Sequence, residues 1–533
     1  MIPMHDSFDM ADGRTRRRSY AALFMLPLLC AVFALLQLRE QQPYWGGRMS
    51  DPSYTYLLSS LHIATFSAPT HIDHPGTTVQ EIGALTLRAL HLFVSSDELT
   101  NAVLADPEWH AQAIGLVLIA LAIGASLAAG IWVFRRTGRL GAALVSQAGP
   151  LLIANVLAGY SGVRPEPLLI AGAHLWAAVW ILWAEGQIDL QHRPTWLAIA
   201  ALGGVCLATK YTFAPLLVIP LVLLPDWRGR ACFSAAGLAA FSIMIAPAWP
   251  RWHRMASWVF RLAARDGGYG SGVTTFRPRE GWRHAILNTV ADNSAFSLVL
   301  ASTALVLALG WRRADSDSAT ARRRRLSLAF VVALAAAVVF VAKQASGSTR
   351  YLLPTAATAP LAVYALWRWQ SGRLSLRLRR LLVATGGAAV LAFALPVATR
   401  QIALVHGERA AALEAPDWIA RNLPGANIVP YYGASSIPYS LGQAEVYLNC
   451  WAPTLARLYP QFIWFDLWGA NFKRNFTLEP AAPPDGVFYL EGVPLEGELL
   501  DHVCRRLRCT LTPVWNNRVE VIYRVALLDP ATS

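Results

Sequence analysis

The sequence has little charge and almost no lysine. Charged residues make up 15% of the 533 positions, and lysine occurs only at 210, 343 and 473, so the formal net charge of +13 comes almost entirely from arginine. A disordered chain would bury far less apolar surface, and an ordinary soluble protein of this length would not reach 55% hydrophobic residues. The composition excludes both classes and indicates an integral membrane protein.

Several nucleotide and metal motifs are also missing. The chain contains no P-loop, no GxGxxG fingerprint, no CxxC pair and no His/Cys metal spacing. We therefore predict no required cofactor and assign no metal ligand. The arginines do not predict a nucleic-acid partner either, because they cluster between apolar segments, where membrane topology explains them better.

Apolar segments long enough to cross a bilayer recur over the first three quarters of the chain. A hydrocarbon core about 30 Å thick needs about 20 apolar residues in a helix, and about eleven segments approach that length. They lie near residues 19–38, 112–134, 140–159, 167–184, 195–209, 212–225, 231–249, 295–311, 326–343, 351–367 and 381–399. The sequence predicts an all-α polytopic membrane domain over residues 1–399.

Arginine is concentrated in alternate connecting segments. These segments lie near residues 14–18, 135–139, 228–230, 312–325 and 373–380. The positive-inside rule places them in the cytoplasm. The N-terminus is then cytoplasmic and the C-terminus extracytoplasmic, and the remaining segments face outward.

The first outward segment, residues 39–111, is expected to be structured, with two surface helices. Asp51 precedes Pro52 at the start of the first helix, and His74 lies in the turn before the second. Helix capping alone would explain Asp51. Alternatively, desolvation at the membrane boundary would raise its proton affinity and suit a general base. His74 is either a turn residue or, with the N–H groups of the next helix, a phosphate ligand.

Three more outward turns carry ionisable residues where the topology rule expects few cations. They are Arg164-Pro165-Glu166, Lys210-Tyr211-Thr212, and Lys343 with Arg350-Tyr351. Snorkelling would explain an arginine at a membrane boundary but not the adjacent glutamate. A bound anion is one physical reason to place two of the three lysines there, and chance is the alternative, since short turns tolerate an occasional lysine.

The outward loop 250–294 combines a basic stripe with a glycine-rich segment. Arg254, Arg261 and Arg265 recur at helical spacing and would face lipid headgroups, which makes membrane lipids expected partners. The following segment contains Asp266 and Tyr269 among glycines. It is either a plain flexible loop or a lid over the same cavity.

The apolar runs stop near residue 400, where short alternating segments begin. We predict an extracytoplasmic α/β domain over residues 400–533. Its helices are expected at 407–425 and 495–507, and its strands at 427–432, 444–449, 486–492 and 518–527. Cys504 and Cys509 would either form a disulfide or remain free thiols, and the sequence favours neither.

The order and sidedness of these motifs resemble the GT-C superfamily of integral membrane glycosyltransferases, particularly the bacterial group similar to protein mannosyltransferases and aminoarabinose transferases. The motifs are Asp51, the HPG turn at 74–76, the RPE turn at 164–166, Lys210-Tyr211-Thr212 and the run from Arg350 to Pro354. The resemblance covers most of the chain. It implies a bacterial inner-membrane protein, a sugar donor linked to polyprenyl phosphate, and Asp51 at the position of the catalytic acidic residue.

The chemistry of that reaction gives the candidate residues their roles. A sugar leaving from phosphate needs cations or donors where negative charge collects, and the acceptor hydroxyl needs a base. The base would be Asp51, with Glu166 as second acid or as the orienter of Arg164. The donor phosphate would be bound by His74, Arg164, Lys210, Tyr211, Lys343, Arg350 and Tyr351. A divalent cation between Asp51 and the phosphate would be compatible, although no ligand cluster requires one.

Two other functions remain open from the sequence. A polytopic transporter or lipid flippase would use the intramembrane charges to line a pathway. A non-catalytic envelope assembly protein would need neither Asp51 nor the outward lysines. For the transferase, the acceptor could be a lipid, a glycan or a protein.

Overall fold

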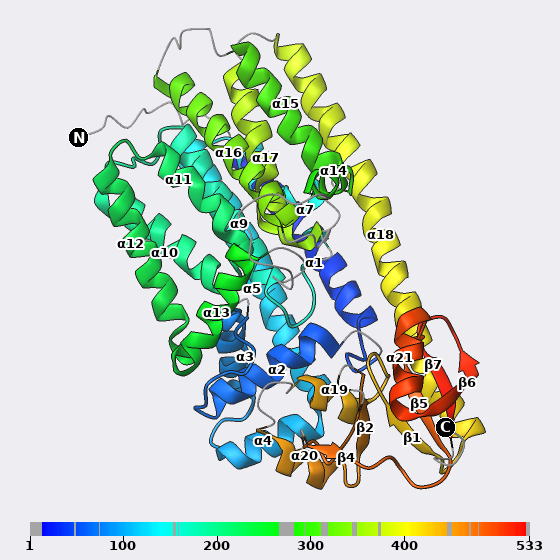
Figure 1. The fold of residues 1–533 in the computed structure, drawn as a ribbon. Coiled ribbons are helices and arrows are strands. Elements are labelled where there is room, and N and C mark those ends of the chain that lie inside the picture. The colour runs from blue at the N-terminus through cyan, green and yellow to red at the C-terminus, as the bar shows by residue number, and fades with distance from the viewer. Residues whose placement is uncertain are drawn as a thin grey trace.

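The computed structural model describes most of the chain and shows a helical body with strands confined to the C-terminal part (Figure 1). The described residues are 13–46, 50–73, 75–152, 156–157, 159–265, 282–292, 294–310, 318–343, 349–370, 375–444, 450–467, 469, 471–477 and 479–528. The predicted fold class, a polytopic all-α domain followed by an α/β region, is confirmed.

Four helices of the described chain are long and apolar enough to cross a membrane. They are α1 (Gly13–Glu40), α5 (Pro107–Thr137), α9 (Glu166–Ala184) and α16 (Ser318–Lys343). A fifth span results if α12 (Trp227–Met244) is counted together with η3 (Ala246–Arg251) and α13 (Trp252–Ala264), which follow it after an 80° bend.

Several segments expected as full crossings are shorter helices. They are α6 (Leu140–Gln147), α7 (Gly149–Leu152), α10 (Arg193–Thr209), η2 (Tyr211–Leu217) and α11 (Val218–Leu223). The further helices of the body are α14 (Trp282–Asp292), α15 (Ser294–Gly310), η5 (Thr349–Leu352) and α17 (Leu353–Gln370). Length and composition within the described residues thus support fewer spans than the expected eleven, because apolar runs of about 15 residues fall short of a full crossing.

Local sequence sets the ends of the longest span, α5. The Asp106 carboxylate accepts a hydrogen bond from the Trp109 N–H, and Pro107 occupies the first turn, where no N–H is needed. At the other end, Arg135 and Arg136 lie in the last turn, where cations are favourable. The helix stops at Gly138, which has a φ of 66°.

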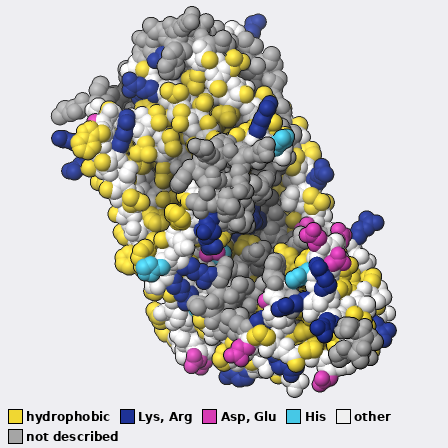
Figure 2. Space-filling model, viewed as in Figure 1, with side chains coloured by type: hydrophobic (Ala, Val, Ile, Leu, Met, Phe, Trp, Pro, Cys, Tyr) yellow, Lys and Arg dark blue, Asp and Glu magenta, His cyan; other side chains and the backbone are white. Residues whose placement is uncertain are grey.

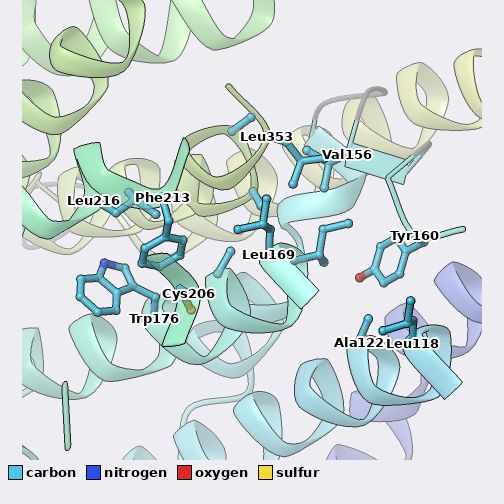
Figure 3. Packing of buried hydrophobic residues seen from close by; sticks show 14 of the residues in the cluster. Leu118, Ala122, Val156, Tyr160, Leu169, Trp176, Cys206, Phe213, Leu216 and Leu353 are labelled. Atoms are coloured by element: carbon cyan, nitrogen blue, oxygen red, sulfur yellow. The ribbon is translucent and has the colours of Figure 1, made fainter. Parts of the chain in front are cut away.

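The core of the body surrounds α9, most of which is buried. Figure 3 shows Leu169 of α9 between side chains of neighbouring helices, including Leu118 of α5 and Leu353 of α17. Close helix contacts depend on small residues: a Cβ at Gly149 would overlap the carbonyl of Ala357 in α17. Figure 2 shows that hydrophobic side chains also cover much of the outer surface of the body, as a membrane-embedded protein requires.

The first loop, expected at residues 39–111, forms the two predicted helices and a third that was not predicted, and it ends where α5 begins at Pro107. α2 (Ser50–Ala64) and α3 (Thr77–Leu90) are followed by α4 (Ser96–Ala105), whose capping box joins Ser95 and Glu98. The exposed side of α3 carries apolar residues such as Leu85, 72% exposed, which fits a helix lying in a membrane interface. The C-terminal part packs on this loop through α19 (Ile437–Ala444) on α2 and α20 (Ala452–Leu458) on α4 (Figure 1).

The C-terminal part contains two sheets and α21 (Gly497–Leu507). The larger sheet has the order β1-β5-β7-β6: β1 (Asn427–Pro430) is parallel to β5 (Phe488–Gly492), while β7 (Val521–Leu527) is antiparallel to β5 and to β6 (Cys509–Asn516). The smaller antiparallel sheet consists of β2 (Ile463–Asp466), β3 (Asn471–Arg474) and β4 (Pro480–Ala481).

Most of the expected C-terminal elements are present. β1, β5, β7 and α21 confirm the predictions at 427–432, 486–492, 518–527 and 495–507. The strand expected at 444–449 falls almost wholly outside the described residues, and Ala444 ends α19. β6 and the smaller sheet were not predicted, because the strands of that sheet are too short to show alternation and Pro513 lies at a bulge in β6.

The helix α18 (Leu376–Asn422) joins the body to the C-terminal part without a break. The domain boundary expected at 399/400 therefore falls inside a helix. Within the described residues Cys504 and Cys509 are free thiols. Burial, and secondarily the neighbouring Cys504, raises the pKa of Cys509 to about 12.

Candidate functional site

The candidate site begins where α9 begins. Pro165 and Pro167 flank Glu166 and favour the first helical turn, in which the missing N–H groups have no cost. A carboxylate in the first turn also interacts favourably with the helix N-terminus. The sequence Arg164-Pro165-Glu166 thus fixes Glu166 at one end of the central helix.

Lys210 binds this carboxylate from a different part of the chain. It ends α10 in an extended conformation, and its Nζ donates to Glu166 Oε1 at 2.7 Å. Both side chains are only 7% exposed. Because removing two charges from water costs several kcal/mol per ion, such a pair is weak evidence for stability and stronger evidence for a role in binding or chemistry.

Arg164 lies beside this pair. Its Nε donates to the Ser161 carbonyl at 2.6 Å. Burial lowers the pKa of Arg164, the Glu166 carboxylate opposes that shift, and Arg350 adds to it, which shows that the three charges interact. The guanidinium remains protonated because arginine titrates far above neutral pH.

The ring of Tyr351 lies between the buried Lys210 and the exposed Arg350. Lys210 Nζ lies 5.3 Å from the centroid of the Tyr351 ring, and Arg350 Cζ lies 5.2 Å from it. Arg350 Nη2 also donates to the Tyr351 hydroxyl at 3.2 Å, and its side chain is exposed. We call these residues the Glu166 cluster: Arg164, Glu166, Lys210, Arg350 and Tyr351.

Two buried hydroxyls accompany the cluster. Ser161, next to Gly162 with its φ of 89°, and Thr212, two residues after Lys210, have side-chain oxygens with no hydrogen-bond partner among the described residues. Buried hydroxyls normally find a partner. Two cations beside one carboxylate, with Arg350 on the neighbouring Tyr351 and buried hydroxyls close along the chain, suit an oxyanion such as phosphate.

The N-terminus of α3 reaches the same region. Gly76, before α3, has a φ of 69°, and a Cβ there would lie 2.6 Å from the Tyr56 hydroxyl, so the turn requires glycine. Thr78 Oγ1 donates to Thr209 Oγ1 at 2.8 Å, directly before Lys210. The first loop is thereby joined to the end of α10.

Asp73 was not singled out from the sequence, and it lies near Tyr211, which directly follows Lys210. Asp73 is 5% exposed and interacts electrostatically with Tyr211. An aspartate directly before the HPG turn was the available signal. This aspartate was overlooked because a turn before the second helix already accounted for the local sequence.

The structure brings together five of the predicted site residues, those of the Glu166 cluster, and places Tyr211 beside Asp73. Asp51 lies in the first turn of α2, and Lys343 is the last residue of α16. The structure describes the backbone of both residues but not their side chains. His74, Asp266 and Tyr269 lie outside the described residues. Their roles stay predictions.

Among described residues, no group of three or more His, Cys, Asp or Glu side chains is arranged to hold a metal ion.

Comparison with known proteins supports the architecture. No protein-family model matches the chain. No curated protein matches it either. Among solved structures, the chain is similar to the crystal structure of ArnT from Cupriavidus metallidurans bound to undecaprenyl phosphate, with 15% sequence identity, a TM-score of 0.51, and coverage of 95% of this chain and 98% of that one. At this identity the similarity shows the fold alone, and it extends over nearly the whole chain, the helical body and the C-terminal part included.

Proposed function

We propose that this protein is a membrane glycosyltransferase that moves a sugar from a polyprenyl-phosphate donor to an extracytoplasmic acceptor. The observation that carries the proposal is the buried Lys210–Glu166 pair with Arg164, Arg350 and Tyr351 around it. The cluster combines three cationic side chains with one carboxylate, so its net charge is positive, and it lies at one end of the central helix α9. The fold is similar to that of a protein whose structure contains undecaprenyl phosphate.

The cluster would hold the donor phosphate and stabilise it as it leaves. Lys210 supplies a compact point charge, and Arg164 and Arg350 supply forked donors suited to phosphate oxygens. Glu166 keeps Lys210 and Arg164 in position, since a lysine without it would be free to turn away. Tyr351 sets the spacing between Lys210 and Arg350 through its ring. His74, Tyr211 and Lys343 complete the proposed phosphate ligands.

In the reaction, the acceptor hydroxyl attacks the anomeric carbon of the donor. The new carbon–oxygen bond forms as the bond to the phosphate oxygen breaks, and that oxygen keeps the electron pair. The hydroxyl proton passes to Asp51 at the start of α2. A general base contributes typically about 10²- to 10⁴-fold, so charge stabilisation by the cluster and positioning must supply the rest.

Transfer by purified protein tests the proposal. Radiolabelled polyprenyl-phosphate sugars would be offered with lipid, glycan and protein acceptors, and wild type should transfer label to one of them. Asp51→Asn should lose at least about 100-fold in rate. Asp97→Asn, the same change at an exposed position of α4, is the matched control and should retain full activity.

Equilibrium binding of undecaprenyl phosphate distinguishes the role of Asp51 as the base from the role of the Glu166 cluster in holding the phosphate. Asp51→Asn should bind this lipid as wild type does, whereas Lys210→Met should bind it weakly. Full transfer by Asp51→Asn removes the assigned base. Lipid movement across a bilayer without any transfer would instead support a flippase.

A further inference from the structure

The C-terminal sheet has a second face that is not part of its own core. Side chains alternate along a strand, so Phe488 and Leu490 of β5 point into the hydrophobic cluster of the C-terminal part, while Glu491 points to the opposite face. In β1, Pro430 is the register partner of Glu491 and shares that opposite face. The last turns of α18 cover this face (Figure 1).

A pocket of about 310 Å³ lies between this face and α18. Its walls are mostly apolar. It is lined by Pro416, Ile419 and Ala420 of α18, Ile428 and Pro430 of β1, Ser435, Ser436, Phe462 and Glu491. The volume falls within the range of small-molecule sites.

Among the described residues of this lining, Glu491 is the only charged one, and it is 4% exposed. Its Oε1 has no hydrogen-bond partner in the part of the chain that the structure describes. A buried carboxylate oxygen without a donor is costly, so a ligand group that donates to it would relieve that cost.

A second carboxylate lies next to the pocket. Glu520 is fully buried and accepts hydrogen bonds from the Ser435 N–H at 3.2 Å and from the Ser435 hydroxyl. It stands two residues before Ile522, the β7 partner of Glu491, and therefore on the same side of the sheet. Burial, and secondarily Glu520, raises the pKa of Glu491 well above its usual range, and burial raises the pKa of Glu520 to about 7.

No lysine, arginine or histidine is among the described residues that line the pocket. Two neighbouring carboxylates in an apolar site cannot both ionise without a compensating cation. Calcium typically takes six to eight oxygen ligands, whereas the lining offers one carboxylate and two serine hydroxyls among apolar side chains. An organic cation matches both the charge and the apolar walls.

We propose that this pocket is a binding site for a protonated amine carried on a small apolar or ring-shaped body. The ammonium group donates to Glu491, and the body packs against Phe462 and the residues of α18 and β1. The site is separate from the Glu166 cluster and does not depend on the proposed transferase activity.

Calorimetric titration of the full-length protein in detergent tests this site, with phenethylamine as the probe and 2-phenylethanol as its neutral counterpart. Wild type should bind the amine saturably and the alcohol weakly. Glu491→Gln should weaken amine binding about 10- to 100-fold, the usual value of a charged hydrogen bond. Glu498→Gln, at an exposed position of α21, is the matched control and should change nothing.

The pH dependence gives an independent measurement. Because the ammonium must displace the proton held by the carboxylates, amine binding should strengthen about tenfold from pH 6 to pH 8. Glu491→Gln should reduce that slope. Ala420→Trp, a change at an exposed position of the pocket rim, should block binding while leaving both carboxylates and the thermal unfolding transition intact.

Three results would overturn the proposal. One is wild-type affinity for the amine in both Glu491→Gln and Ala420→Trp. Another is equal binding of phenethylamine and 2-phenylethanol, which would remove the role of charge. The third is saturation by CaCl₂ with no binding of the amine, which would assign the carboxylates to a metal.

Discussion

The two ends of α9 each carry a glutamate bound to cations, but in different surroundings. At the end opposite Glu166, Glu185 caps the helix. It accepts hydrogen bonds from Arg139 Nη1 at 2.6 Å, Arg368 Nε at 2.8 Å and the Tyr364 hydroxyl at 2.8 Å, with Arg323 Nη2 at 3.5 Å. These partners come from the start of α6, from α16 and from α17, so Glu185 ties the ends of several helices together.

The difference lies in the exposure of the cations. Lys210 at the Glu166 end is 7% exposed. The cations at Glu185 range from 13% exposed for Arg323 and 23% for Arg368 to 48% for Arg139. An exposed arginine keeps most of its hydration, and its segment is one of those expected in the cytoplasm. A buried lysine loses that hydration, and its single carboxylate partner does not offset the cost. We therefore rest the proposed phosphate site on the nearly complete burial of Lys210, and not on the ion pair alone.

The largest expected effect is that of Lys210→Met. Glu166 would remain buried without its cation, so we expect a loss of about 3–5 kcal/mol in the free energy of unfolding. Transfer should fall at least about 100-fold through loss of charge stabilisation. Thermal unfolding and binding of undecaprenyl phosphate measure the two effects separately.

The double variant Lys210→Met/Glu166→Gln distinguishes structure from function. It removes both charges and should regain most of the stability without regaining lipid binding. If lipid binding returned together with stability, the pair would be structural, and the contrast between the two ends of α9 would not hold.

Glu185→Gln should have a smaller effect than Lys210→Met, and it should lower stability more than lipid binding. Loss of hydrogen bonds to a charged group should lower the free energy of unfolding by about 2–3 kcal/mol, while lipid binding changes less than tenfold. Arg139→Gln, which removes one exposed partner, should cost less than about 1 kcal/mol. Chemical denaturation and the same binding assay provide the measurements, and a larger loss of binding than in Lys210→Met would reverse the comparison.

The smallest effect is expected at Tyr351. Tyr351→Ala removes the ring that contacts Lys210 and Arg350, and cation–π contacts of about 0.5–2 kcal/mol correspond to roughly 3- to 30-fold weaker lipid binding. Tyr351→Phe keeps the ring and should bind within about threefold of wild type. Equal losses in both variants would assign the effect to the hydroxyl instead.

The sequence by itself determined the class of protein and the unusual residues. A chain with 55% hydrophobic residues and repeated apolar runs must bury its backbone hydrogen bonds in membrane helices. Glu166, Lys210 and Arg350 were identifiable because an ionised side chain beside an apolar run is costly wherever the chain folds. The strands β5 and β7 were predicted for a similar reason, since alternation of side chains is a local property.

Only the tertiary structure decided which of these residues meet. Lys210 and Glu166 are 44 positions apart, and their contact depends on the packing of α9 against α10, which no local pattern encodes. The pocket at Glu491 could not be predicted for the same reason: the strand and a helix over 407–425 were both expected, but not the packing of that helix on the second face of the strand. α18 continues past residue 400 because a change from apolar to polar side chains alters the surroundings of a helix without breaking its hydrogen bonds. Contacts between distant segments arise from packing, and packing is a property of the whole chain.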